Sequence, residues 1–284
     1  MKEAFAFPSS LGHTLQGYFY HYADPIPGRI VVFDHGFGGG HLAYMKEIEK
    51  LCRRGFLVFS YDHTGCMESG GADPRGLSQS LCDLNDCLTA LKAHPRAAGL
   101  DISVMGHSWG GFSCLNIAPF HPDVSHIVVL SGFISPEKII GQFFGGILKG
   151  YRKCILAMEK ENNPRFAGCC ATESLAGTNA KVLLIYSDND KSVRKDIHFD
   201  ALEKSFRNRE NIRLMLVQGK SHNPNYTVDA VRYKDTFFAA LTAAAKKKEL
   251  VTDEQKAAFV ASWDWERMTV QDDAVWKEIF LALE

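Results

Sequence analysis

Short runs made mostly of apolar residues recur along the chain and alternate with segments whose apolar residues follow a helical spacing. The runs lie at residues 30–33, 56–61, 101–105, 127–130, 182–186 and 212–217. A continuous apolar run of this length is typical of a strand that is covered on both faces of a sheet. The segment 78–93 carries Leu81, Leu84, Leu88 and Leu91 at the spacing of an amphipathic helix. The alternation predicts an α/β fold with a mostly parallel, doubly wound sheet and helices on both of its faces.

Two further segments near the amino terminus have the pattern of half-buried strands. Residues 4–7 (Ala-Phe-Ala-Phe) and 14–20 alternate in side-chain character in the manner of half-buried antiparallel strands, and a turn at 9–12 separates them. We expect them to join the sheet as antiparallel strands, which brings the total to about eight.

The strand pattern stops between residues 134 and 180. This segment is helical in character, and its apolar face includes Ile139, Ile140, Phe143 and Phe144. It leaves the sheet at the carboxyl end of the strand at 127–130, and open α/β sheets bind ligands at that edge. We therefore assign 134–180 to an inserted helical cap, and 1–133 with 181–284 to the core domain.

The last part of the chain has two candidate helices and an aromatic segment between them. Residues 228–245 form one helix, and Trp276, Ile279 and Phe280 belong to the apolar stripe of another at 272–283. Either of these two helices could be the last helix that packs on the sheet of the core. We therefore expect residues 246–284 to contain additional C-terminal helices. The segment 259–265 either packs on the sheet or contacts a partner, and we expect any homodimer to form through the cap or these C-terminal helices.

Composition and charge exclude several classes of function. The 284 residues carry a formal net charge of −1, so nothing favours binding to nucleic acid or to an anionic membrane. No stretch approaches the ~20 apolar residues of a membrane span, and the amino terminus does not resemble a secretory signal. The eight cysteines lack Cys-x-x-Cys spacing and nearby zinc-site histidines. We expect a cytoplasmic protein with reduced cysteines and no metal.

A serine between glycines directly follows the strand at 101–105. The segment reads Gly106-His107-Ser108-Trp109-Gly110-Gly111. Gly-x-Ser-x-Gly after a strand is typical of a sharp strand-to-helix turn that exposes a nucleophilic serine. Gly106 and Gly110 would be needed where the neighbouring backbone leaves no room for a Cβ.

The other groups that a nucleophilic serine requires also follow predicted strands. Asp188 and Asp190 follow the strand at 182–186, and His222 follows the strand at 212–217. The order Ser108, aspartate, His222 is that of α/β-hydrolase catalytic triads. His222 would accept the serine proton, and the aspartate would orient His222.

Five segments together resemble the α/β-hydrolase superfamily. They are His35-Gly36-Phe37, the segment Asp62–Gly71, the serine turn, Ser187-x-x-Asp190-x-x-Val193, and Gly219-x-x-His222. The resemblance is to the capped branch that includes monoacylglycerol lipases, lysophospholipases, feruloyl-type esterases and serine aminopeptidases. Within Asp62–Gly71 the chain departs from the lipase pattern, since Thr64 stands where arginine is common and Met67 where glycine is usual. Ser187 also replaces a glycine.

The resemblance implies a role for each of these residues. Ser108, Asp190 and His222 would form the triad, with alignment to Val193 favouring Asp190 over Asp188. The oxyanion hole would consist of the backbone N–H groups of Phe37 and Trp109. The side chains of Phe37, Trp109, Phe143 and Phe144 would line the substrate site.

The expected activity is that of a cofactor-independent serine hydrolase that acts on small or medium carboxylic esters. The candidate substrates are monoacylglycerol-like esters and aromatic esters. The first alternative is a serine aminopeptidase of the prolyl-aminopeptidase type, because Gly-x-Ser-Trp-Gly also resembles those enzymes. Its cap would have to supply carboxylates for the substrate amine, for which the candidates are Glu137, Glu159, Glu161 and Glu173. The second alternative is a non-catalytic ligand-binding protein with the same fold. No nucleotide cofactor is expected, because neither Gly36–His41 nor Leu214–Ser221 completes a nucleotide-binding motif.

Overall fold

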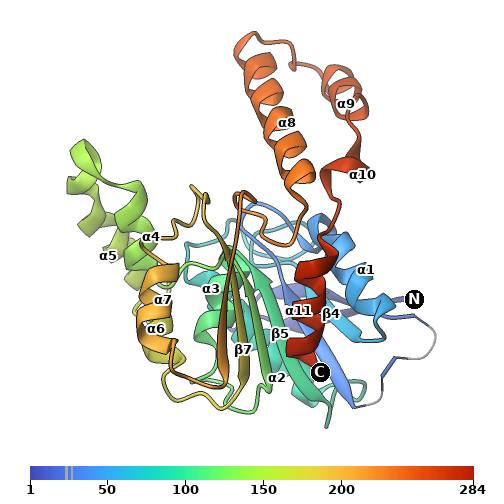
Figure 1. The fold of residues 1–284 in the computed structure, drawn as a ribbon, viewed down its shortest axis with the longest axis vertical. Helices are drawn as coiled ribbons and strands as arrows, with labels where there is room; N and C mark the ends of the chain where they lie inside the picture. The colour runs from blue at the N-terminus through green and yellow to red at the C-terminus, as the bar shows by residue number, and fades with distance from the viewer. Residues whose placement is uncertain (23–24, 27) are drawn as a thin grey trace.

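The computed structural model describes residues 1–22, 25–26 and 28–284. Its centre is one eight-stranded sheet with the order β1-β2-β4-β3-β5-β6-β7-β8 (Figure 1). The strands are β1 (Lys2–Pro8), β2 (Thr14–Tyr20), β3 (Arg29–Asp34), β4 (Leu57–Tyr61), β5 (Asp101–His107), β6 (His126–Leu130), β7 (Lys181–Ser187) and β8 (Ile212–Val217). From β4 to β8 all neighbours are parallel, while β2 pairs antiparallel with both β1 and β4. The predicted α/β fold with eight strands is confirmed.

Helices cover both faces of the sheet because successive strand residues point to opposite sides. In β3, Ile30 and Val32 pack on the face covered by α2 (Gln79–Ala93), α3 (Trp109–Asn116) and α7 (Phe199–Phe206). Val31 and Phe33 pack on the face covered by α1 (Met45–Arg53) and α11 (Asp273–Leu283). The 3-10 helix η1 (His41–Tyr44) precedes α1.

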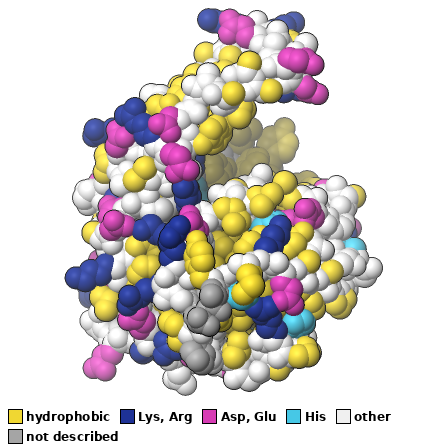
Figure 2. Space-filling model, turned by 90° about the vertical axis from the view of Figure 1, so that its right-hand side faces the viewer, with side chains coloured by type: hydrophobic (Ala, Val, Ile, Leu, Met, Phe, Trp, Pro, Cys, Tyr) yellow, Lys and Arg dark blue, Asp and Glu magenta, His cyan; other side chains and the backbone are white. Residues whose placement is uncertain are grey.

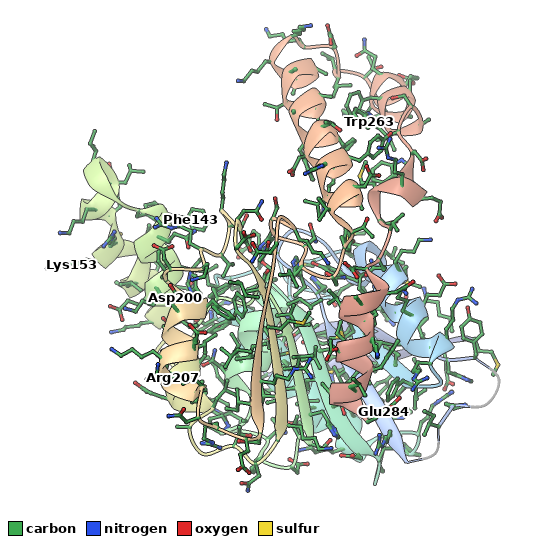
Figure 3. All side chains as sticks on the ribbon, viewed as in Figure 1. Phe143, Lys153, Asp200, Arg207, Trp263 and Glu284 are labelled. Atoms are coloured by element: carbon green, nitrogen blue, oxygen red, sulfur yellow. The ribbon has the colours of Figure 1, made fainter. Side chains whose placement is uncertain are left out.

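The segment after β6, which is predicted to form a cap, is helical. Its helices are α4 (Pro136–Phe143), the 3-10 helix η2 (Gly146–Tyr151), α5 (Arg152–Asn162) and the short α6 (Ala171–Ser174). The ribbon shows α4 and α5 projecting beyond the sheet, and Lys153 lies at their outer end (Figure 3). In contrast, Ala171 and Leu175 are buried in the core beneath them.

A second helical projection follows β8. It consists of α8 (Val228–Lys246), α9 (Asp253–Ala261) and α10 (Trp265–Met268), and we call residues 228–268 the C-terminal arm. Trp263 packs inside it, with its ring centroid 5.3 Å from that of Phe237 and 5.5 Å from that of Tyr233. The aromatic segment therefore packs against α8 and not against the sheet. The last helix on the sheet is α11, which settles the choice that the sequence left open.

The arm leaves and rejoins the core through a narrow neck. Tyr226 and Gln271 form an antiparallel bridge, the Thr227 N–H donates to the Val270 carbonyl at 3.0 Å, and the Asp272 N–H donates to the Asn225 carbonyl at 2.8 Å. No helix in the described parts of the chain is both long enough and apolar enough to cross a membrane.

Candidate active site

Ser108 lies in a sharp turn between β5 and α3. Its backbone has φ 55° and ψ −107°, a conformation that residues other than glycine rarely adopt. A Cβ at Gly106 would overlap the Gly110 carbonyl, and a Cβ at Gly110 would overlap the Asp34 carbonyl. Side chains larger than that of glycine would therefore not fit at Gly106 and Gly110, as the sequence pattern predicts. The turn places Ser108 at the carboxyl edge of the sheet.

His222 and Asp190 meet at the same edge. The distance from His222 Nδ1 to Asp190 Oδ2 is 2.7 Å, and Asp190 is 4% exposed. The other carboxylate oxygen of Asp190 accepts hydrogen bonds from the backbone N–H groups of Ser192 at 2.8 Å and Val193 at 3.0 Å. Since a carboxylate only accepts, Nδ1 carries the proton, and Nε2 is the nitrogen that can take another.

Asp188, the alternative acid, has a different role. It is exposed, and its carboxylate accepts a hydrogen bond from the Gly219 N–H at 2.8 Å. This contact joins the loops that follow β7 and β8. The structure thus brings Asp190, and not Asp188, to His222.

Ser108 and His222 line a common cavity of about 310 Å³. The other lining residues are Phe37, Leu77, Trp109, Phe133, Ile139, Phe143, Ser192 and Val193. Three of the four residues expected at the substrate site are therefore present, including Phe143, which lies where α4 approaches the core (Figure 3). Phe144 is half-buried and does not line this cavity. It follows the end of α4, where the helical spacing that grouped it with Phe143 no longer applies.

Two lining residues that the sequence analysis missed differ in how they could have been found. Phe133 follows the end of β6, so the strand pattern predicts its position at the carboxyl edge of the sheet. Leu77 precedes α2, and no periodic pattern indicates it. It is fixed instead by the indole N–H of Trp109, which donates to the Leu77 carbonyl at 2.6 Å.

A buried chain of hydrogen bonds links the serine turn to two neighbouring loops. His107 Nε2 lies 2.7 Å from the His222 carbonyl, and His107 Nδ1 lies 2.7 Å from the Tyr44 hydroxyl. The Gly36 N–H donates to that hydroxyl at 3.1 Å. Because a carbonyl only accepts, Nε2 is the protonated nitrogen of His107, so the Tyr44 hydroxyl donates to Nδ1. Burial and the neighbouring His222 hold the pKa of His107 well below its usual value, which keeps this ring neutral.

The two residues predicted to supply the oxyanion donors, Phe37 and Trp109, both line the serine cavity. Trp109 is the first residue of α3, where backbone N–H groups have no partner within the helix. Phe37 is on the loop after β3, and its ring centroid is 5.0 Å from that of Trp109. Within the described residues, neither backbone N–H group donates a hydrogen bond.

His35 stabilises the loop that carries Phe37 through two hydrogen bonds. Its Nδ1 donates to the Gly36 carbonyl at 2.8 Å, and its Nε2 accepts from the His63 N–H at 3.0 Å. Burial, followed by the charge of His63, lowers the pKa of His35 to about 3. His35 is therefore a neutral structural support for the loop.

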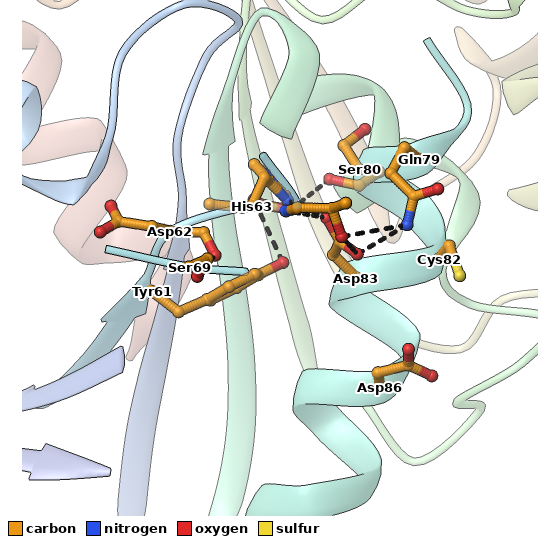
Figure 4. Close-up of polar contacts among 12 residues, drawn as sticks. Tyr61, Asp62, His63, Ser69, Gln79, Ser80, Cys82, Asp83 and Asp86 are labelled. Atoms are coloured by element: carbon orange, nitrogen blue, oxygen red, sulfur yellow. Dashed lines mark hydrogen bonds and ion pairs between the residues drawn. The ribbon is translucent and has the colours of Figure 1, made fainter. Parts of the chain in front are cut away.

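A buried ionic cluster surrounds His63 (Figure 4), whose ring centroid is 4.6 Å from that of Trp109. His63 Nε2 lies 2.5 Å from Asp34 Oδ1, and His63 Nδ1 lies 3.2 Å from Asp83 Oδ2, with all three side chains fully buried. Burial alone would lower the pKa of His63, but the two carboxylates outweigh it and raise that pKa to about 10. Asp83 also accepts from the Thr64 N–H, the Thr64 hydroxyl and the Gln79 amide, each at 2.8 Å. Nowhere in the described chain do three or more His, Cys, Asp or Glu residues form a group suited to a metal ion.

The departure from the lipase pattern at Met67 has a visible consequence. Met67 has φ 44°, in the left-handed region that glycine adopts without cost. The side chain is 65% exposed and passes beside Gly40, where a Cβ would collide with it. The turn that the family usually builds with glycine is kept here with a strained methionine.

The four cap carboxylates do not line the serine cavity. Glu137, Glu161 and Glu173 are exposed, and Glu159 is 5% exposed. Glu159 accepts hydrogen bonds from the Leu77 N–H at 2.5 Å, the Ser78 N–H at 3.1 Å and the Ser78 hydroxyl at 2.9 Å. It therefore binds the backbone just before α2 and ties α5 to the loop that carries Leu77.

Comparison with known sequences gives one family and a set of partial relatives. Residues 25–169, about half of the chain, match the family model described as serine aminopeptidase, S33. A protein of Caulobacter segnis that carries the name carbamate hydrolase RutD is 31% identical over 128 residues. That match covers 42% of this chain and 44% of the relative.

Solved structures with the same fold cover more of the chain. An esterase of Pyrococcus furiosus has a TM-score of 0.63 at 17% identity, over 87% of this chain and 92% of that one. A monoacylglycerol lipase of Paleococcus ferrophilus has a TM-score of 0.54 at 21% identity, over 74% of this chain and 90% of that one. At these identities the likeness establishes the fold. Together with the matching family model, it shows that the chain belongs to the S33 serine aminopeptidase family of α/β-hydrolases.

Proposed function

We propose that this protein is a serine hydrolase that cleaves carboxylic esters through an acyl-enzyme intermediate. The observation that carries the proposal is the His222–Asp190 hydrogen bond of 2.7 Å beside a cavity that Ser108 and His222 line together. A serine hydroxyl becomes a useful nucleophile only when a base removes its proton and a third group orients that base. These three side chains have the chemistry that this requires.

In the first half-reaction, Ser108 Oγ attacks the ester carbonyl carbon while His222 Nε2 takes the hydroxyl proton. Asp190 keeps the imidazole in the required tautomer and stabilises its charged form. The negative charge that develops on the carbonyl oxygen is met by the N–H groups of Phe37 and Trp109. Loss of one such donor typically costs about 3 kcal/mol of transition-state stabilisation.

Collapse of the tetrahedral species breaks the bond to the alcohol, and His222 returns the proton to the leaving oxygen. Water then attacks the acyl-serine with His222 as its base, which releases the acid and restores Ser108. The side chains around Ser108 are mainly apolar, and 310 Å³ is near the lower end of the ~300–1,000 Å³ of small-molecule sites. Both features favour acyl groups of small or medium size.

The position of the cap carboxylates argues against aminopeptidase activity despite the family's name. An aminopeptidase must neutralise the substrate ammonium, and no Glu or Asp lines the serine cavity among the described residues. Carbamate hydrolysis, suggested by the name of the Caulobacter relative, would use the same triad on a carbonyl with a nitrogen substituent. A panel with matched ester, carbamate and aminoacyl-anilide substrates separates these activities.

The decisive test is Ser108→Ala. We expect it to lower turnover of p-nitrophenyl butyrate at least about 1,000-fold and to abolish labelling by a fluorophosphonate probe, with an unchanged melting temperature. Ser205→Ala, at an exposed position on α7, is the matched control and should behave as the wild type. Hydrolysis that survives in Ser108→Ala contradicts the proposal, and failure of the wild type to react with the probe would favour a non-catalytic binding protein.

Location and assembly are also part of the proposal. All eight cysteines are free thiols, which suits a reducing compartment, and on this ground we propose a cytoplasmic enzyme. A homodimer through the cap or the C-terminal helices stays a prediction.

A further inference from the structure

A second cavity, of about 620 Å³, lies between the arm and the triad loops. We call it the arm cavity. It is lined by Asn189, Asp190, Lys191 and Ser192 after β7, by Ser221, His222 and Asn223 after β8, and by Val231, Lys234, Asp235 and Phe238 of α8. Figure 2 shows the molecule hollowed where the arm stands over the body. Ser192 and His222 line both this cavity and the serine cavity, so the imidazole that must return a proton borders both spaces.

The two cavities differ in chemistry. The serine cavity is lined by Phe37, Leu77, Phe133, Ile139 and other apolar side chains. The arm cavity is lined mainly by amides, hydroxyls and charged groups. An ester has two parts on either side of its reacting carbon, and these surroundings suit an apolar acyl group and a polar alcohol.

Lys234 supplies a positioned cation in the arm cavity. Its Nζ donates to the Asn223 Oδ1 at 2.9 Å and lies 5.4 Å from the centroid of the Tyr226 ring. Asn223 follows His222 directly, so the ammonium is held next to the histidine loop. An ammonium has three donors, and this contact uses one.

Within the described residues, Lys234 forms no ion pair with a carboxylate. No carboxylate of the described chain lies within 4 Å of its Nζ. Of the carboxylates that line the cavity, Asp190 is bound to His222 and Asp235 is exposed. Burial lowers the pKa of Lys234, while the charges of Glu47 and Asp235 oppose this shift. A half-buried cation of this kind gains from an incoming anion.

We propose that the arm cavity receives the alcohol part of the substrate and that Lys234 binds an anionic group, a carboxylate or phosphate, on that alcohol. The inference rests on the proposed function, because the leaving oxygen must lie beside His222 to receive its proton. The arm would thus select the alcohol, while the cap and the core select the acyl group.

Butyrate esters of three para-substituted phenols test the proposal. They are 4-(butyryloxy)benzoate, its neutral methyl ester, and 4-(butyryloxy)phenyl phosphate. The readout is the ratio of kcat/KM for each anionic ester to kcat/KM for the neutral one. We expect Lys234→Met to lower this ratio about tenfold or more, through KM, because a hydrogen bond to a charged group is lost. Lys234→Arg should retain most of the ratio.

Arg232→Met is the matched control. Arg232 is an exposed cation on the same helix that does not line the arm cavity, so its loss should leave the ratio unchanged. A ratio that is the same in Lys234→Met and the wild type overturns the proposal, as does an equal fall in Arg232→Met. Whichever anionic ester has the ratio that depends more strongly on Lys234 identifies carboxylate or phosphate as the preferred anion.

A binding measurement separates this proposal from the proposed function. Calorimetric titration of 4-hydroxybenzoate into Ser108→Ala and into Ser108→Ala/Lys234→Met requires no turnover. We expect an affinity at least about tenfold weaker in the double variant. Equal affinities overturn the anion site, whereas Lys234-dependent binding without hydrolysis of any ester would contradict the proposed esterase activity alone.

Discussion

Replacing His63 by glutamine removes the positive charge that lies between two buried carboxylates while keeping a side chain that can donate a hydrogen bond. Asp34 and Asp83 would then face each other across a neutral group in a fully buried site. Breaking a buried ion pair by removing one partner typically costs about 3–5 kcal/mol. We therefore expect His63→Gln to lower the free energy of unfolding by about that amount.

The pKa of His63 gives an independent magnitude and a pH dependence. It is about 10 in the folded protein, against about 6.5 for an exposed histidine. The folded state therefore binds the proton more tightly, and the resulting stability is present in full below pH 6.5, where it amounts to about 5 kcal/mol. It is about 4 kcal/mol at pH 7 and is lost as the pH rises through about 10.

Urea unfolding of the wild type and His63→Gln between pH 7 and pH 10 measures this difference. The difference in unfolding free energy should shrink toward pH 10. In thermal unfolding at pH 7, the melting temperature of His63→Gln should be about 10 °C lower than that of the wild type. Adding Asp34→Asn to His63→Gln removes one uncompensated carboxylate and should restore at least half of the loss. A difference below about 1 kcal/mol at pH 7, or one that does not change with pH, would refute the assignment of a charged His63.

Two further predictions concern contacts around the serine. Tyr44→Phe leaves the Gly36 N–H without its acceptor and His107 Nδ1 without its donor; we expect kcat to fall about tenfold with KM nearly unchanged, since each orphaned group costs ~1–3 kcal/mol, and an equal change in KM would argue against a positioning role. Glu159→Gln weakens the hydrogen bonds of a charged carboxylate to Leu77 and Ser78 just before α2, so we expect about 1–2 kcal/mol less stability and a KM several-fold higher; an unchanged unfolding curve would contradict this.

The features that were predictable from the sequence are those that follow strands. Buried strands have an apolar run as their signature, and parallel strands end at one edge, so Ser108 and His222 could be assigned to that edge from their positions along the chain. The choice of Asp190 over Asp188 rested on a family motif; in the structure Asp190 is the one that contacts His222, at 2.7 Å.

The features that escaped prediction depend on contacts between segments without a common period. Tyr44 reaches His107 from the end of the 3-10 helix η1, and Glu159 reaches Ser78 across 81 positions of the chain. The choice between two C-terminal helices failed for another reason. Both α8 and α11 carry apolar stripes, but α8 buries its stripe against α10 and the aromatic residues of the arm, which no local pattern distinguishes from packing on a sheet.

The narrow neck of the arm makes this segment exchangeable. The chain leaves the core at Thr227 and returns at Val270, and backbone hydrogen bonds pair these two points. The length of the arm between them therefore does not change where the following residues rejoin the core. Insertions, deletions or replacement by another helical hairpin would leave α11 in register on the sheet. Sequence changes in the arm can thus alter the wall that α8 contributes to the arm cavity without changing Ser108, Asp190 or His222, which all lie outside residues 228–268.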